Sequence, residues 1–342
     1  MNSSDQLLLA GDIGGTKTDL AIFDRRRWPG SPIFRQTFAN HNYTSFEDLL
    51  SDFACQAHLP GRACFGVAGP VLAGRIEMTN LAWVLDSTEL AERFRFQDVC
   101  LINDLVATAL GATLLPQTEL HDINRGNGQD SGTMAVLAPG TGLGEAFLLP
   151  VTASGYRAFP SEGGHASFAP RNVEQAELLA FLWQEREHVS VEQVCSGSGM
   201  INLYRYLRTI HQEPAWLRER LAEAEDPTPV LVQAALADKT GREPCQIAAK
   251  TISLFLDILA DEAANLALKV LATRGIYLGG GMLPRLLPLL EADRFNTLFQ
   301  RGVYKKILTD IPLRIILNPG TALLGAAAHG FAGTTETTAA PA

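Results

Sequence analysis

The sequence lacks paired cysteines. It has five cysteines among 342 residues, an odd number, and they are widely scattered without a CxxC pair. A disulfide framework needs an even set at characteristic spacings, and a zinc knuckle needs closely spaced Cys or His ligands. Neither is therefore indicated, and a reducing cytosol is the simplest compartment to expect.

The sequence also lacks an excess of basic residues and long apolar runs. Lys and Arg total 28 against 37 Asp and Glu, a formal net charge of −9. A nucleic-acid surface needs a clustered basic face, so we expect no nucleic-acid partner. No run approaches the roughly 18 uncharged apolar residues of a membrane span, and no export signal opens the chain. We therefore expect no membrane association and a globular chain of about two domains.

The stretch LLLAGDIGGTKTDLAIFD (7–24) predicts a strand, a glycine turn and a second strand. Gly14 and Gly15 can adopt φ > 0 and bring backbone N–H groups close to an anion, and Thr16 and Lys17 add further donors. This is phosphate-binding chemistry, with Asp12 just ahead of the turn. An ordinary Gly-Gly hairpin is the alternative. A P-loop is less favoured, because its pattern requires Gly directly before Lys.

A near copy of this device follows in TMAVLAPGTGLGEAFLL (133–149), with Gly140, Thr141 and Gly142 in its turn. Two such hairpins suggest a duplicated fold in which two lobes close on one nucleotide. The glycine spacing is GxGxG and a strand is expected after it, so a Rossmann dinucleotide site is disfavoured.

Polar residues at predicted turns and strand ends are candidate ligands. Asn103 and Asp104 follow a predicted strand (99–102) and precede a helix, where a capping role is equally open. In MTNLAW (78–83), Thr79, Asn80 and Trp83 could face a polar ligand. Three further candidates are the Glu and His around a Gly-Gly pair and a Glu before a Ser/Gly turn: Glu162, His165 and Glu192.

The coarse pattern completes the outline. RGIYLGGGMLP (274–284) predicts a strand ending in Gly279, Gly280 and Gly281, against which an adenine or ribose could lie; a plain tight turn is the alternative. A long buried helix is expected over 247–273. Residues 113–132 are polar and rich in Gly and Asn, which predicts a loop near a domain boundary. A helix of small residues near the C-terminus could pack back on the first lobe.

Seven motifs in order resemble the bacterial glucokinases of the actin-like ATPase superfamily: GDIGGTK, MTNLAW, LINDL, APGTGLG, SEGGH with FAP, SVEQVCSG and LGGGMLPR. The resemblance runs from Leu8 to about His329. It implies an α/β, two-lobed, ribonuclease H-like fold with duplicated mixed sheets and a cleft between the lobes. The expected division is a small domain (1–114 with 318–333), a large domain (115–317) and a disordered tail (334–342).

The resemblance further implies a cytoplasmic enzyme, a homodimer in that family's pattern, that phosphorylates D-glucose with MgATP. Asp104 would be the general base, and Asp12 would lie near the Mg²⁺, largely through water. The implied glucose ligands are Asn80, Asn103, Asp104, Glu162, His165 and Glu192. The implied nucleotide-binding residues are Gly14, Gly15, Thr16, Lys17, Gly140, Thr141, Gly142 and Gly280.

Two departures matter. Lys17 stands where many of these glucokinases have Asn, and GGTK is more typical of the sister group of sugar kinases and repressors, the ROK family. That group carries a zinc cluster CxCGxxGC after its Gly-Gly-His, whereas here the next cysteine after His165 is Cys195. Its absence favours the zinc-free glucokinases. Ser167 replaces an acidic residue common in the family. A kinase for another hexose and an inactive sugar sensor remain the alternative functions.

Overall fold

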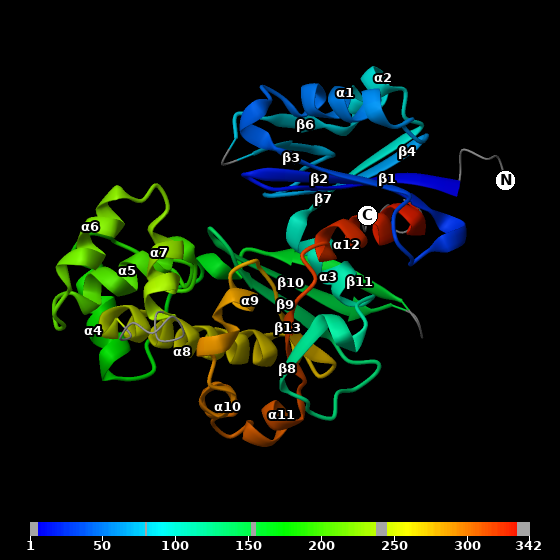
Figure 1. Cartoon of the computed structure of the whole chain (residues 1–342). Coiled ribbons are helices and arrows are strands. Elements are labelled where there is room, and N and C mark those ends of the chain that lie inside the picture. The colour runs from blue at the N-terminus through cyan, green and yellow to red at the C-terminus, as the bar shows by residue number, and fades with distance from the viewer. Residues whose placement is uncertain (1–5, 79–80, 152–154, 237–244, 334–342) are drawn as a thin grey trace. The chain divides into compact units, whose positions relative to one another are not determined.

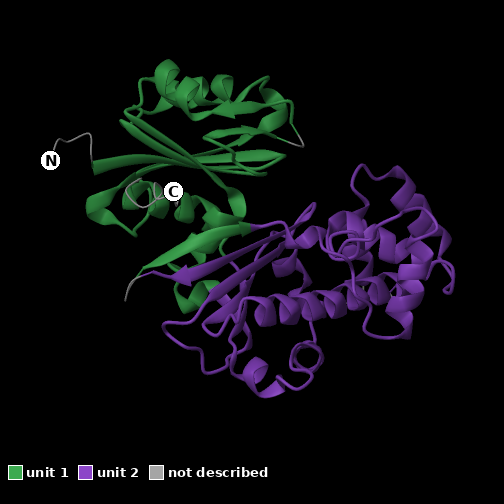
Figure 2. Ribbon diagram, turned by 180° about the vertical axis from the view of Figure 1, so that it is seen from behind, with its two compact units in different colours: residues 1–119, 154–160, 318–342 green, residues 120–153, 161–317 purple. Residues whose placement is uncertain are grey.

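The computed structural model describes residues 6–78, 81–151, 155–236 and 245–333. The chain divides into two compact units, shown in Figure 2. Unit 1 comprises residues 1–119, 154–160 and 318–342, and unit 2 comprises residues 120–153 and 161–317. Among the described residues, no helix has the length and apolar character needed to cross a membrane.

Unit 1 is built on a five-stranded sheet with the order β3-β2-β1-β4-β7. β1 pairs antiparallel with β2, and β4 pairs parallel with both β1 and β7. β5 and β6 form a separate antiparallel pair. The strands are β1 (Leu7–Ile13), β2 (Lys17–Asp24), β3 (Phe34–Ala39), β4 (Arg62–Val67), β5 (Arg75–Glu77), β6 (Val84–Asp86) and β7 (Asp98–Asn103).

Helices cover both faces of this sheet because β1 is apolar on both sides. Leu9 and Ile13 belong to a core formed with α1 (Phe46–Gln56), whereas Leu8 and Ala10 belong to a core formed with α12 (Thr321–Ala332). Figure 1 shows α1 and α2 on one side of the sheet and α3 and α12 on the other. The remaining helices of unit 1 are α2 (Ser87–Phe94), α3 (Asp104–Ala112) and the 3₁₀ turns η2 (Arg25–Arg27), η3 (Asn40–Asn42) and η4 (Gln117–Glu119).

The small residues of α12 let it lie directly on α3. A Cβ on Gly325 would come within 1.6 Å of the Ala107 carbonyl oxygen, and a Cβ on Gly111 within 1.9 Å of the Thr321 carbonyl oxygen. Only glycine permits backbones to approach this closely. The prediction that the C-terminal small-residue helix returns to the first lobe is confirmed.

The sheet of unit 2 has six strands in the order β11-β10-β9-β12-β13-β8, and its edge strand β11 consists mostly of residues 156–160, which are grouped with unit 1. β9 and β10 form an antiparallel hairpin, and β12 pairs parallel with both β9 and β13. This repeats the arrangement of β2, β1, β4 and β7 in unit 1, which confirms the predicted duplication. The strands are β8 (Leu120–Asn124), β9 (Met134–Pro139), β10 (Leu143–Pro150), β11 (Tyr156–Ser161), β12 (Gly275–Leu278) and β13 (Leu313–Ile316).

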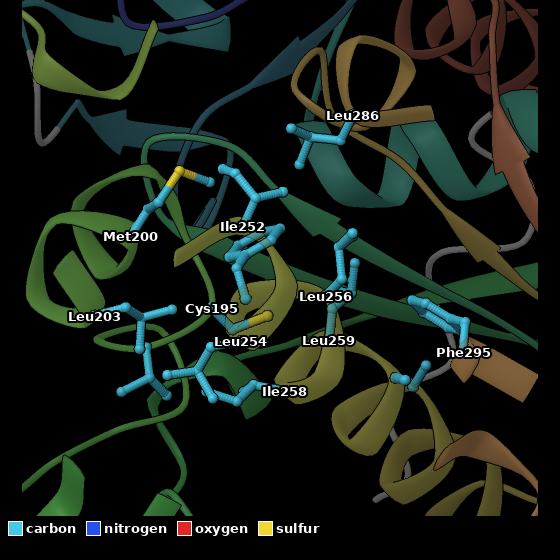
Figure 3. Packing of buried hydrophobic residues seen from close by; sticks show 14 of the residues in the cluster. Cys195, Met200, Leu203, Ile252, Leu254, Leu256, Ile258, Leu259, Leu286 and Phe295 are labelled. Atoms are coloured by element: carbon cyan, nitrogen blue, oxygen red, sulfur yellow. The ribbon is translucent and has the colours of Figure 1, made fainter. Parts of the chain in front are cut away.

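The core of unit 2 surrounds α8 (Gln246–Lys269), the predicted long buried helix. In Figure 3, Ile252, Leu256 and Leu259 of α8 lie among apolar side chains from other helices, including Met200 and Leu286. The other helices are α4 (Val173–Leu182), α5 (Gly197–Leu207), α6 (Ala215–Glu223), α7 (Pro227–Ala235), α9 (Leu283–Leu286), α10 (Ala292–Phe299), α11 (Lys305–Asp310), η5 (Gly163–His165) and η7 (Leu287–Leu289).

The prediction that residues 113–132 form only a loop is wrong, because β8 lies within them. β8 pairs antiparallel with β13 at the edge of the sheet. Only Ile123 of the strand is fully buried, and Asp122 holds Arg314 of β13 through a 3.0 Å contact between Oδ1 and Nε. An edge strand whose partners are polar carries little of the alternating apolar pattern that identifies a strand.

Candidate functional site

Asn40 makes hydrogen bonds to the predicted phosphate turn between β1 and β2. Asn40 Nδ2 donates to the Gly14 carbonyl oxygen at 2.8 Å, and its backbone N–H donates to Thr16 O at 3.0 Å. Its Oδ1 accepts from the Thr18 hydroxyl at 2.8 Å. Asn40 is 1% exposed, so these bonds are shielded from water. The turn is therefore fixed in shape before any ligand arrives.

The glycines of this turn are used for space. Neither Gly14 nor Gly15 has a positive φ, so the turn does not use the conformational freedom that the sequence analysis expected of these glycines. A Cβ on Gly14 would lie 3.3 Å from the Lys17 carbonyl oxygen, which accepts from Gly14 N–H at 3.1 Å. Thr16 and Lys17 are exposed at the tip. The side chains of Thr16 and Lys17 are thus exposed to a ligand, whereas the Gly14 N–H is used within the turn.

Asp12 stands directly across the hairpin from Asp19. Burial of the Asp12 carboxyl and the negative charge of Asp19 raise the pKa of Asp12 to about 6, while Lys17 and Arg35 act in the opposite direction. Asp19 is neutralised by Arg35, whose Nε lies 3.0 Å from Asp19 Oδ1 and whose Nη2 contacts Oδ2. A buried carboxyl with a raised pKa is stabilised as the anion by any cation that comes near it.

Asn103 takes the capping role that the sequence left open between Asn103 and Asp104 at the β7–α3 junction. Asn103 is the N-cap of α3: its Oδ1 accepts from the N–H groups of Leu105 at 2.9 Å and Val106 at 3.1 Å. Its Nδ2 donates to Gly69 O at 3.1 Å. Asp104 is the first residue of the helix, partly exposed, with Oδ1 accepting from Leu105 N–H at 2.9 Å. Asn103 thus supplies the capping side chain.

The parallel strands of unit 1 bring Asp12 and Asp104 to one edge of the sheet. Asp12 of β1 pairs with Gly66 of β4, and Gly66 pairs with Ile102 of β7, two residues before Asp104. All three strands end at this edge, where ligands bind in open α/β sheets. A Cβ on Gly66 would meet the Ala107 Cβ at 2.9 Å, so glycine here lets α3 approach.

Asn80 and Thr79 lie outside the described residues. Trp83, which the sequence offered as a ligand-facing residue, is 4% exposed and belongs to the apolar core that also contains Phe46. That expectation is wrong, because an indole ring gains more from burial than a partly solvated position would give it.

In unit 2, the predicted second phosphate turn meets the N-terminus of α5. Gly140 N–H donates to Gly142 O, and Gly197 N–H, at the start of α5, donates to Gly140 O, both at 2.8 Å. Gly199 N–H, also in the first turn of α5, donates to Ser196 Oγ at 2.9 Å, so these two N–H groups are bonded and the helix start favours anions through its dipole. Gly280 has φ +90°, and a Cβ there would lie 2.3 Å from Pro139 O, so only glycine fits against this turn. Gly140, Thr141, Gly142 and Gly280 are therefore neighbours.

Gly280 also shows how far the duplication extends. It stands two residues after the end of β12, and Gly69 stands two residues after the end of β4, the equivalent strand of unit 1. Both adopt positive φ, +90° and +125° respectively. Gly69 in GVAGP and Gly280 in LGGGMLP therefore occupy matching backbone positions after equivalent strands.

The three predicted sugar ligands of unit 2 converge on His165. Its Nε2 lies 4.0 Å from Glu162 Oε2, and its Nδ1 lies 4.0 Å from Glu192 Oε1. The side chains of Glu162 and His165 are 70% and 61% exposed, against 26% for Glu192. The carboxylates accept and the imidazole both donates and accepts, which is the set needed for sugar hydroxyls.

Glu192 links this trio to the phosphate turn. Its Oε2 accepts from Leu143 N–H at 2.8 Å, while Oε1 faces His165. A Cβ on Gly142 would lie 2.5 Å from the same Oε2, so the turn needs glycine where the carboxylate passes. The backbone N–H of Glu192 also donates to Gly164 O at 2.9 Å. One side chain therefore holds both predicted binding elements of unit 2.

Glu145 is a buried acid that the sequence did not single out. It lies on β10, is 2% exposed, and its Oε1 has no hydrogen-bond partner among the described residues. Gly163, beside Glu162, packs on it: a Cβ there would lie 2.0 Å from Glu145 Oε2. Burial and the negative charge of Glu262 raise the pKa of Glu145 to about 7, against a smaller opposite effect of Lys269. The sequence feature that could have identified Glu145 is a single acidic residue within an otherwise apolar strand.

The described residues include no group of three or more His, Cys, Asp or Glu side chains placed to hold a metal ion. A dedicated metal cage of the zinc-enzyme type is therefore absent from that part of the chain. A carboxylate such as Asp12 can still contribute one hard oxygen ligand to a cation held mainly by other groups.

Comparison with known proteins assigns the family. A family model described as glucokinase matches residues 9–331. The glucokinase of Nostoc punctiforme is 36% identical over 339 residues, covering 94% of this chain and 98% of the relative. The crystal structure of a glucokinase from an Antarctic psychrotroph superposes with a TM-score of 0.81 at 32% identity, covering 96% and 99% of the two chains.

A more distant structure shares the fold. The glucokinase from Balamuthia mandrillaris, solved in complex with glucose, superposes with a TM-score of 0.70 at 22% identity, covering 96% of this chain and 94% of the other. The motifs of the present sequence, its duplicated sheets and these matches agree, and the chain belongs to the glucokinase family.

Proposed function

We propose that this glucokinase transfers the γ-phosphoryl group of ATP to the 6-hydroxyl of D-glucose, with Asp104 as the general base. The observation that carries the residue assignment is the position of Asp104 at the β7–α3 junction. Asn103 caps the helix, and Asp104, the partly exposed first residue of α3, lies at the sheet edge that also carries the phosphate turn. As glucose O6 attacks, Asp104 accepts its proton.

The sugar is oriented by paired hydrogen bonds. We assign Glu162, His165 and Glu192 to glucose hydroxyls, because His165 lies 4.0 Å from each of the two carboxylates and the three side chains combine donors with acceptors. Glu192 then connects the bound sugar to the Gly140–Gly142 turn through Leu143 N–H. Asn103 contributes indirectly, by fixing the first turn of α3, since both of its side-chain polar atoms already have backbone partners.

The nucleotide phosphates are assigned to the two glycine turns. In the first, the backbone of residues 15–16 and the exposed Thr16 and Lys17 supply donors. In the second, the donors come from Thr141 and Gly142, beside the positive end of the α5 dipole. Gly280 is assigned to the same site because it packs against Pro139 at the base of the second turn. These are the backbone and helix-terminus groups that bind phosphates in general.

Mg²⁺ is the expected companion of ATP, and Asp12 fits its preference for carboxylate oxygen. When bound, the ion neutralises charge on the β- and γ-phosphates. The described residues offer no cage, so we propose that the phosphates and water supply the other ligands.

We also propose that the protein is a cytoplasmic homodimer, which sedimentation and cell fractionation would test.

A coupled assay with MgATP and a panel of hexoses tests the function directly. Glucose is expected to give the highest kcat/KM, with mannose, fructose and N-acetylglucosamine far lower. A higher kcat/KM for another hexose would be consistent with a sugar kinase but would contradict the assignment of glucose as its substrate. Binding of glucose by calorimetry without turnover of any hexose would instead indicate a sugar sensor.

A further inference from the structure

Two cysteines of unit 1 lie side by side on β4 and on the neighbouring edge strand β7. Cys64 on β4 and Cys100 on β7 are directly paired in the parallel register. Neighbouring strands lie about 4.8 Å apart, which falls within the Cα separation that a disulfide tolerates, roughly 4.4–6.8 Å. Cys100 precedes Asp104 by four residues, and neither cysteine has a role in the phosphoryl transfer described above.

The C-terminal turn of α12 covers this pair. A Cβ on Gly330 would lie 2.9 Å from the Cys64 Cβ, and Arg62 Nη2 donates to the Gly330 carbonyl oxygen at 2.7 Å. Cys64 is therefore completely buried. Cys100 is partly exposed and lines a hollow of about 10 Å³ together with His329 of α12 and Asp98. That volume is about the space of one water molecule.

The surroundings favour a thiolate on Cys100. The Cys64 thiol, which donates a hydrogen bond to it, and then His329 lower the pKa of Cys100 to about 5, while burial and Asp98 act in the opposite direction. Arg62 adds a positive charge, though Asp98 partly neutralises it across 3.7 Å. The pKa of Cys64 is raised, because it gives its proton to that hydrogen bond and is buried. In this pair Cys100 is therefore the nucleophile and Cys64 the thiol that keeps its proton.

We propose that Cys100 and Cys64 form a peroxide-sensitive dithiol, with Cys100 as the attacking sulfur and Cys64 as the resolving one. The Cys100 thiolate attacks one oxygen of hydrogen peroxide, the O–O bond breaks, and the leaving hydroxide takes a proton to become water. Cys64 then attacks the resulting sulfenic sulfur, loses its proton and releases a second water. Two thiols are oxidised to a disulfide, and one peroxide is reduced to two waters.

Cys100 is partly exposed at the hollow, so hydrogen peroxide can reach its sulfur. Cys55, exposed on α1, provides the internal reference for an exposed thiol. At pH 7 an ordinary cysteine with pKa about 8.5 is about 3% thiolate. The larger thiolate fraction of Cys100 is offset by the lower nucleophilicity of an acidic thiolate, so we expect Cys100 and Cys55 to react with peroxide at comparable rates and to differ in their product.

The test uses the folded full chain, limiting hydrogen peroxide and peptide mass spectrometry. The expected product is a Cys64–Cys100 disulfide, two hydrogens lighter than the two thiols and reversed by dithiothreitol. Cys64→Ser should stop the reaction at a Cys100 sulfenic acid that dimedone traps, and His329→Gln should slow it several-fold. Cys55→Ser is the matched control and should change nothing at Cys100.

Two results would overturn the proposal. One is a Cys100 sulfenic acid that dimedone traps in the wild-type protein without any Cys64–Cys100 disulfide, while circular dichroism shows the protein to be folded. The other is the same Cys100 product with and without the Cys64 thiol. Both readouts are chemical and independent of hexose phosphorylation. A Cys64→Ala variant keeps the test available if serine at that buried position prevents folding.

Discussion

Replacing Glu145 by Gln should stabilise the protein in a pH-dependent way. Glu145 is buried on β10, its Oε1 lacks a hydrogen-bond partner among the described residues, and burial raises its pKa from 4.5 to about 7. In the unfolded chain the carboxyl is solvated and ionises near its ordinary pKa. Folding therefore favours the protonated form, and ionisation above that range opposes folding.

The sign and size follow from the two pKa values. Between pH 4.5 and about 7 the native state binds more protons at Glu145 than the unfolded state, so the stability contribution falls as pH rises. One pKa unit corresponds to about 1.36 kcal/mol, so the full penalty above pH 7 is roughly 3 kcal/mol. About 2 kcal/mol of this should develop between pH 5 and pH 8. Gln has nearly the same shape and does not ionise, so it escapes the penalty.

Urea unfolding of wild type and Glu145→Gln at pH 5 and pH 8 measures this directly. Other titrating groups affect both proteins and cancel in the difference. Glu223→Gln, at an exposed position on α6, is the control and should give the same difference at both values. A Glu145→Gln difference that is equal at pH 5 and pH 8, or a variant less stable than wild type at pH 8, would refute the reasoning.

Three further changes test the site. Asp12→Asn should raise the Mg²⁺ concentration needed for half-maximal activity, and an unchanged metal titration would remove Asp12 from that role. His165→Ala should weaken glucose binding by about 1–3 kcal/mol in calorimetry because hydroxyls lose their partner; His58→Ala, at an exposed loop position, is the control, and a change within twofold would leave His165 structural. Asn103→Ala should lower the free energy of unfolding by about 0.5–2 kcal/mol through loss of the α3 cap; unchanged stability would contradict the capping assignment.

The sequence predicted best what is encoded locally. The two hairpins at 7–24 and 133–149 follow from apolar runs that flank glycine turns, and α8 follows from apolar residues at helical spacing. The duplication was visible because the same device occurs twice. Family motifs then pointed to residues such as Glu162 and His165, which the structure places beside each other.

Long-range contacts account for what the sequence did not predict. Asn40 supports the first phosphate turn from 26 residues away, and nothing around it marks that role. Glu192 contacts both His165 and the second phosphate turn, and the contact with the turn is made by Leu143 N–H, which lies 49 residues away in the sequence. β8 was not predicted, because an edge strand with polar partners lacks the alternation of apolar and polar residues that identifies a strand. The Asn103 side chain competes for a cap with its neighbour, and only the backbone geometry decides between them.

Turnover of Asp104→Asn is the most direct test of the central claim. Because Asn103 supplies the cap and the substituted amide keeps the size of the carboxylate, folding and glucose affinity should be retained. An amide cannot accept the proton from O6, so kcat should fall roughly 10²- to 10⁴-fold. Loss of turnover of this size, with glucose binding still measurable by calorimetry, is the result that a general base predicts; near-normal kcat would contradict it.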